Sequence, residues 1–138
     1  MAFSPGSLRE GMDSMAKLPD VLAAAWEERD GPVVLTTVGE GGKPNSIYAS
    51  CVSRFGDDMI VVADNFFDKT RANILAGSTG SILFITKSGK SLQVKGPLER
   101  HTGGEVFDDM KSWNGERPGH AAVTLRVEEA FSGAKRLL

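Results

Sequence analysis

The fold of this chain is decided by one stretch, which reads Met59-Ile-Val-Val-Ala-Asp-Asn-Phe-Phe-Asp68-Lys69-Thr70-Arg71-Ala-Asn73-Ile-Leu-Ala76. The apolar residues 59–63 predict a short strand, and the residues from Lys69 onward predict a helix. A helix start leaves backbone N–H groups without partners and carries partial positive charge. The donors of Lys-Thr-Arg add to these, so the stretch is typical of a phosphate-binding site. An ordinary surface helix with Asp68 as its N-cap explains the same local sequence.

Length and composition indicate one ordinary globular domain. The chain has 138 residues, and we expect a Gly- and Ser-rich loose arm over 1–17 followed by a folded domain over 18–138. A net charge of -2 argues against non-specific nucleic-acid binding. No apolar run is long enough to span a bilayer, and the N-terminus does not have the pattern of a signal peptide. The single cysteine, Cys51, excludes an internal disulfide and a cysteine metal cluster, so we expect a cytoplasmic protein without a metal.

Before the central stretch, the sequence predicts a helix and a hairpin. Residues 19–28 form the helix, with an apolar face that consists of Val21, Leu22, Ala25 and Trp26. A β-branched strand at 33–38 and a glycine-rich turn at 39–44 follow. The next strand is expected at 45–53. One of its faces is small and polar, which suits either solvent or the surface of a flat ligand.

After the central stretch, the sequence predicts three more strands and one helix. The strand at 80–86 is apolar on both faces and should therefore be covered on both sides. A hairpin leads to the strand at 91–99, where Pro97 indicates an edge or a bulge. A short helix at 105–113 precedes a strand at 121–130, in which Val123, Leu125 and Val127 point inward and Thr124 points outward.

About six strands, short turns and a few short helices predict a mainly β protein built as a small antiparallel barrel. A barrel of this size is filled by its own side chains, so a cofactor must bind outside it. The strand that is apolar on both faces also needs cover. Both requirements are met if two subunits pack face to face, with the ligand in the groove between them.

The order of these elements resembles the FMN-binding split-barrel family related to pyridoxamine 5'-phosphate oxidase, and is closest to its small flavin-nucleotide-binding members. The most specific pieces are Val61 to Thr70 with Asn73, and the preceding segment from Asn45 to Val52. The resemblance spans most of the chain, from about Leu18 to Phe131. It implies a six-stranded split β-barrel of Greek-key type, and a homodimer with FMN at the subunit interface.

The resemblance also implies a set of cofactor contacts. Lys69 and Thr70 would hold the FMN phosphate, the strand residues from Tyr48 to Cys51 would follow the ring, and a second subunit would contribute Ser91 or Gln93. The expected contacts are Tyr48, Ala49, Ser50, Cys51, Val62, Ala63, Lys69, Thr70, Ser91 and Gln93.

Several departures from the family pattern argue against pyridoxamine phosphate oxidation itself. The chain is shorter than that enzyme, and its tail lacks the Arg-Leu-x-Pro ending. Ile47 and Val52 stand where the family usually has an arginine and a lysine that assist the phosphate. In addition, Asp68 puts a negative charge beside the expected phosphate.

We therefore expect an FMN-dependent oxidoreductase with an unknown small substrate or redox partner, and no catalytic residue is assigned. The alternatives are a non-catalytic flavin carrier or electron-transfer protein, and a haem or deazaflavin binder on the same fold. Two histidines are available as haem ligands, His101 and His120, but neither belongs to a ligand cluster. Cys51 has no basic neighbour in sequence and is expected to be a small buried group.

Overall fold

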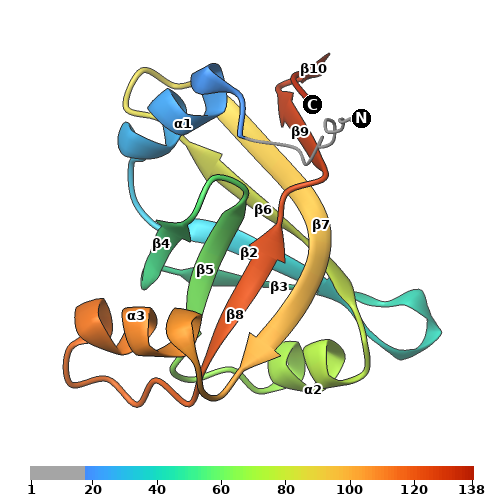
Figure 1. Ribbon diagram of the computed structural model, residues 1–138. Helices are drawn as coiled ribbons and strands as arrows, with labels where there is room; N and C mark the ends of the chain where they lie inside the picture. The colour runs from blue at the N-terminus through green and yellow to red at the C-terminus, as the bar shows by residue number, and fades with distance from the viewer. Residues whose placement is uncertain (1–17) are drawn as a thin grey trace, which may run out of the picture.

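The computed structural model describes residues 18–138, so the expected N-terminal arm at 1–17 lies outside the described residues. Within this range the chain forms three α-helices, one short 3-10 helix and a set of antiparallel strands (Figure 1). Their order is α1 (Asp20–Glu27), β2 (Val33–Val38), η1 (Glu40–Gly42), β3 (Pro44–Ala49), β4 (Val52–Phe55), β5 (Met59–Asp64), α2 (Lys69–Leu75), β6 (Thr79–Ile85), β7 (Ser91–His101), α3 (Glu105–Asn114), β8 (Ala121–Arg126), β9 (Glu129–Ser132) and β10 (Lys135–Arg136).

The strands form one curled antiparallel sheet, which confirms the predicted mainly β fold. The strand order is β3-β2-β6-β7-β8-β5-β4, and the sheet contains nine strands rather than the expected six. Consecutive strands pair as hairpins over long stretches, for example β2 with β3 and β6 with β7. The two ends of this order, β3 and β4, are joined directly along the chain at Ser50 and Cys51. The sheet therefore curls into a half-barrel that is split between β3 and β4.

Two of the predicted strands are each divided in the structure. The segment 45–53 is not one strand, because β3 pairs with β2 whereas β4 pairs with β5. The segment 121–130 divides in the same way: β8 pairs with β5 and β7, and β9 pairs with the first half of β7. The chain must leave one ladder before it enters the next, and alternation of side chains does not reveal this change of partner.

The core lies between the curled strands and contains the predicted inward residues of β7 and β8. Leu92, Val94, Val123 and Leu125 are all buried, and Leu22, Ala25 and Trp26 of α1 join the same cluster. Two residues differ from the prediction. Val21 of α1 is 57% exposed. Thr124 is buried, and its hydroxyl lies at hydrogen-bond distance from His101 and from the carbonyl of Glu99.

The long strand β7 crosses the whole molecule and changes neighbours on one side halfway along (Figure 1). Residues Leu92 to Lys95 pair with β9, and residues Leu98 to His101 pair with β8. Pro97 lies at this change of partner, in the interior of the sheet and not at its edge. Its missing N–H falls where one ladder has ended and the next begins, so the proline is tolerated there.

Helices α2 and α3 lie at one end of the half-barrel, and α1 lies at the other (Figure 1). Val106 and Met110 of α3 pack against Val61, Ala63 and Ala122 in a second apolar cluster on the outer side of β5 and β8. Among residues 18–138, no helix has the length and apolar character needed to cross a membrane.

The face of β6 opposite to the core is partly exposed in the single chain. Ile82 and Phe84 are buried, but Leu83 and Ile85 are 40% and 48% exposed. Cover of this second face by another subunit stays a prediction.

Candidate functional site

A surface groove with a volume of about 370 Å³ lies beside the split of the half-barrel, where β3, the corner at Ser50–Cys51, the end of β5 and the start of α2 meet. Its volume falls within the range of ~300–1,000 Å³ that is usual for small-molecule sites. The lining residues are Asn45, Ile47, Tyr48, Ala49, Ser50, Cys51, Ala63, Asn65, Phe66, Phe67, Asp68, Lys69, Thr70 and Arg117.

The corner between β3 and β4 gives the groove its smooth central wall. The N–H of Ala63 donates to the carbonyl of Cys51 at 3.0 Å, which holds the corner against the end of β5. The wall itself is lined by small side chains, those of Ala49, Ser50, Cys51 and Ala63. Side chains of this size leave room for a flat ligand to approach the backbone.

The start of α2 provides the polar end of the groove. Thr70 is 1% exposed, and its hydroxyl oxygen accepts a hydrogen bond from Asn45 Nδ2 at 3.0 Å. Because the oxygen accepts from Asn45, the hydroxyl hydrogen remains available for donation to a ligand. Lys69 is exposed and lines the same end. This end of the groove therefore offers one flexible cation and one fixed hydroxyl donor.

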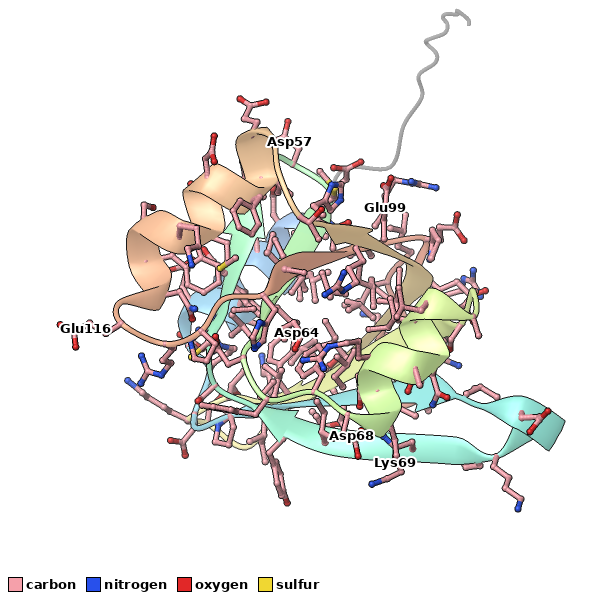
Figure 2. All side chains as sticks on the ribbon, turned by 90° about the horizontal axis from the view of Figure 1, so that it is seen from below. Asp57, Asp64, Asp68, Lys69, Glu99 and Glu116 are labelled. Carbon is pink, nitrogen blue, oxygen red and sulfur yellow. The ribbon has the colours of Figure 1, made fainter. Side chains whose placement is uncertain are left out.

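Arg71 does not contribute its charge to the groove, contrary to the expectation from the Lys-Thr-Arg sequence. Its Nε and Nη2 atoms donate to the two carboxylate oxygens of Asp64 at 2.7 and 2.8 Å. These hydrogen bonds raise the pKa of Arg71 above its ordinary value, and the nearby charges of Asp64 and Asp68 act in the same direction. Asp64 is fully buried. The Nε atom of a second arginine, Arg100, lies 3.8 Å from Asp64 Oδ2. Figure 2 shows Asp64 near the middle of the molecule, and Asp68 and Lys69 side by side at its edge.

A buried pair of asparagines fixes the opposite wall. The side-chain amides of Asn65 and Asn114 exchange two hydrogen bonds of 3.1 and 2.8 Å, and the N–H of Gly119 donates to Asn65 Oδ1 at 2.9 Å. The N–H of His120 donates to the carbonyl of Asp64. The loop that follows α3 is thereby attached to the segment before α2, and it brings Arg117 to the groove.

Arg117 is a groove residue that the sequence analysis missed. It lies in the Arg-Pro-Gly turn after α3, far along the chain from the other lining residues. No periodicity or motif links this turn to the start of α2. The contacts between Asn65 and Asn114, which are 49 positions apart, bring the two together.

Most of the predicted cofactor contacts lie together in the groove. Seven of them line it, namely Tyr48, Ala49, Ser50, Cys51, Ala63, Lys69 and Thr70. Val62 does not, because it is 1% exposed and belongs to the barrel core. Ser91 and Gln93 lie on β7, three strands away from β3 in the sheet order.

The chemistry of the groove is that of a binding site with few ionisable groups. Its lining contains two cationic side chains, Lys69 and Arg117, and one carboxylate, Asp68, but no histidine. His101 instead lies 3.1 Å from the hydroxyl of Thr124, and His120 is exposed on another strand end. Within the described range, no group of three or more metal-binding side chains occurs.

Comparison with known protein families agrees with this arrangement. The profile described as pyridoxamine 5'-phosphate oxidase matches residues 19–135, which is most of the chain. The chain belongs to this family. The resemblance that the sequence suggested is thus confirmed, and so is the split-barrel fold. Among curated proteins, none is similar enough to the chain to count as a match.

Solved structures of family-like proteins share the fold at low sequence identity. An FMN-binding protein from Syntrophomonas wolfei subsp. wolfei is 23% identical, with a TM-score of 0.68 over 78% of this chain and 80% of that one. HupZ from Group A Streptococcus is also 23% identical, with a TM-score of 0.68 over 78% and 91% of the two chains. An F420 reductase is 17% identical, with a TM-score of 0.64 over 83% and 98%. At these identities the likeness establishes the fold alone.

Proposed function

We propose that the groove binds FMN and that the protein is an FMN-dependent oxidoreductase. The observation that carries this proposal is that seven residues expected from the family pattern line one groove of suitable size. They are Tyr48, Ala49, Ser50, Cys51, Ala63, Lys69 and Thr70. Membership of the pyridoxamine 5'-phosphate oxidase family and the fold shared with an FMN-binding protein support it.

The donors of the groove suit the two ends of FMN. The hydroxyl of Thr70 and the ammonium group of Lys69 would bind the phosphate, because both donate hydrogen bonds and one carries positive charge. The corner at Ser50–Cys51 would lie along the ring, where small side chains leave backbone N–H and carbonyl groups within reach. When bound, FMN would supply the electron or hydride transfer, and the protein would orient it and exclude water.

A second candidate is a non-catalytic flavin carrier or electron-transfer protein. The observation that favours it is the groove lining, which within residues 18–138 has no histidine and only one carboxylate to serve as a general acid or base. The two candidates share the cofactor and differ only in whether a substrate reacts at it.

We also infer that the working unit is a homodimer. On the outer face of the sheet, the ladder registers form one row of neighbours: Tyr48, Val34, Leu83, Gln93 and Phe131. The row starts at the groove residue Tyr48, which is 79% exposed, and includes the exposed Leu83. Tyr48 and Gln93 are three strand spacings apart, or ~14 Å, so Gln93 of the same chain is distant from the groove. A second copy packed on this face would cover the apolar side chains and carry its own Gln93 and Ser91 to the groove.

The absorbance of the purified protein tests the proposal. A flavin spectrum, with FMN released on denaturation, is the expected result. A haem or deazaflavin spectrum, or failure to take up added FMN, would contradict the assignment of the cofactor. Oxidation of NAD(P)H in the presence of candidate acceptors then separates the two candidates, since a carrier gives no turnover above free FMN.

A further inference from the structure

The phosphate end of the groove carries little net positive charge. Arg71 is paired with the buried Asp64, which leaves Lys69 as the only cation that α2 presents to the groove within the described residues. Asp68, the residue next to Lys69, lines the same groove and is exposed. Ile47 of β3 also lines the groove and adds no charge to it. The charge of Lys69 is therefore offset by that of Asp68, and the other cation of the groove lining is Arg117, from the loop after α3.

Asp68 is not required as a helix cap. It occupies the N-cap position of α2, but its side chain makes no capping hydrogen bond there. No ion pair within 4.0 Å joins Asp68 to another residue of the described part of the chain. Within residues 18–138 this carboxylate makes neither a cap nor an ion pair, so it acts through its charge, both on Arg71 and on what binds in the groove.

We propose that Asp68 is a specificity-determining residue, whose carboxylate weakens the binding of a phosphate dianion so that FMN is held as an exchangeable ligand and not as a permanent prosthetic group. This inference rests on the proposed function and adds to it the manner in which the flavin is kept. Like charges at the edge of a groove repel one another even after partial screening by solvent. The affinity of the groove for a flavin without phosphate is consequently closer to its affinity for FMN than it would be in a site with only cationic side chains.

Paired titrations with FMN and riboflavin, which differ only in the phosphate, test this role. The variants are Asp68→Asn and Asp68→Ser, both of which keep a small polar group at the N-cap position. Asp57→Asn is the matched control, because it removes the same charge at the other end of the molecule (Figure 2). The dissociation constants and the rate of FMN release are measured by flavin fluorescence.

The expected result is that both Asp68 variants bind FMN about five- to tenfold more tightly and release it more slowly, with riboflavin binding changed less than twofold. Asp57→Asn should leave both flavins unchanged. A ratio of FMN to riboflavin affinity that stays within twofold of the wild type in both Asp68 variants would overturn the role of Asp68 and leave the proposed function intact. If the wild type and all variants bind neither flavin, the proposed function itself is wrong, and the inference is wrong with it.

Discussion

At the scale of single residues, one ion pair to a buried carboxylate decides which side chains of α2 can meet a ligand. The sequence offers Lys69, Thr70 and Arg71 as donors, but Arg71 turns inward to Asp64, with two hydrogen bonds below 3 Å. Asp64 has no exposed surface, so it needs this partner: an unpaired carboxylate at such a site is strongly destabilising. Arg71 thus has a structural role, and the ligand-binding role is proposed for its neighbours Lys69 and Thr70 on the same helical turn.

This division predicts the effect of removing the two remaining donors. The double variant Lys69→Ala, Thr70→Ala should lose FMN affinity by roughly 1.5–3 kcal/mol for each charge-assisted hydrogen bond, while riboflavin binding changes little. Titration of both flavins measures the loss. Lys43→Ala, which changes an exposed lysine between β2 and β3, serves as the control and should bind like the wild type. An unchanged FMN dissociation constant in the double variant would mean that the phosphate binds elsewhere.

At the scale of the elements, β7 holds the two halves of the sheet together, and it depends on a glycine to do so. At Gly96, where β7 changes partner from β9 to β8, an added Cβ would lie 1.8 Å from the carbonyl oxygen of Arg126. No side chain can be accommodated at that distance from a backbone atom. The close approach of β7 and the end of β8 is what lets one strand belong to two ladders.

Gly96→Ala should therefore destabilise the protein by about 3 kcal/mol or more, since the backbone itself must move. Thermal unfolding followed by circular dichroism should show a fall in Tm of roughly 10 °C or more. The matched control is Gly103→Ala, where an added Cβ meets nothing within 4 Å and the backbone is not in the left-handed region. The control should unfold close to the wild-type temperature, and equal Tm values for the two variants would disprove the steric argument.

At the scale of the whole molecule, the outer face of the sheet carries exposed apolar side chains. Leu83 and Ile85 are exposed on β6, directly opposite Gln93 and Ser91 of β7 in the ladder register. Cross-strand partners share a face, so the exposed apolar residues and the residues expected to complete a partner's site lie on one surface. Cover by a second copy would explain why β6 is apolar on both faces.

The double variant Leu83→Glu, Ile85→Glu should consequently be monomeric and should bind FMN more weakly than the wild type. Sedimentation equilibrium should give 14.7 kDa for this variant and twice that mass for the wild type. Val21→Glu, which places one such charge on an exposed apolar position of α1, should remain a dimer. A wild-type protein that sediments as a monomer at micromolar concentration, with or without FMN, would refute the dimer.

Local sequence predicted the features that depend on neighbours along the chain. Alternation with period two marked the buried residues of β7 and β8, glycine-rich segments marked the hairpins, and the order of the elements was enough to recognise the family. The start of α2 at Lys69 was also predicted, because a helix start depends on a few consecutive residues. These features follow from the geometry of a single strand or helix.

Only the tertiary structure decided which side chains meet. It divided two predicted strands, because each half pairs with a different partner, and it turned Arg71 inward to Asp64. It also brought Arg117 to the groove through the contact of Asn65 with Asn114. The segment 59–76 supplies one end of the groove, but the other walls come from β3 and from the loop after α3. Contacts between residues far apart in the chain arise only when the sheet curls, so no local pattern records them.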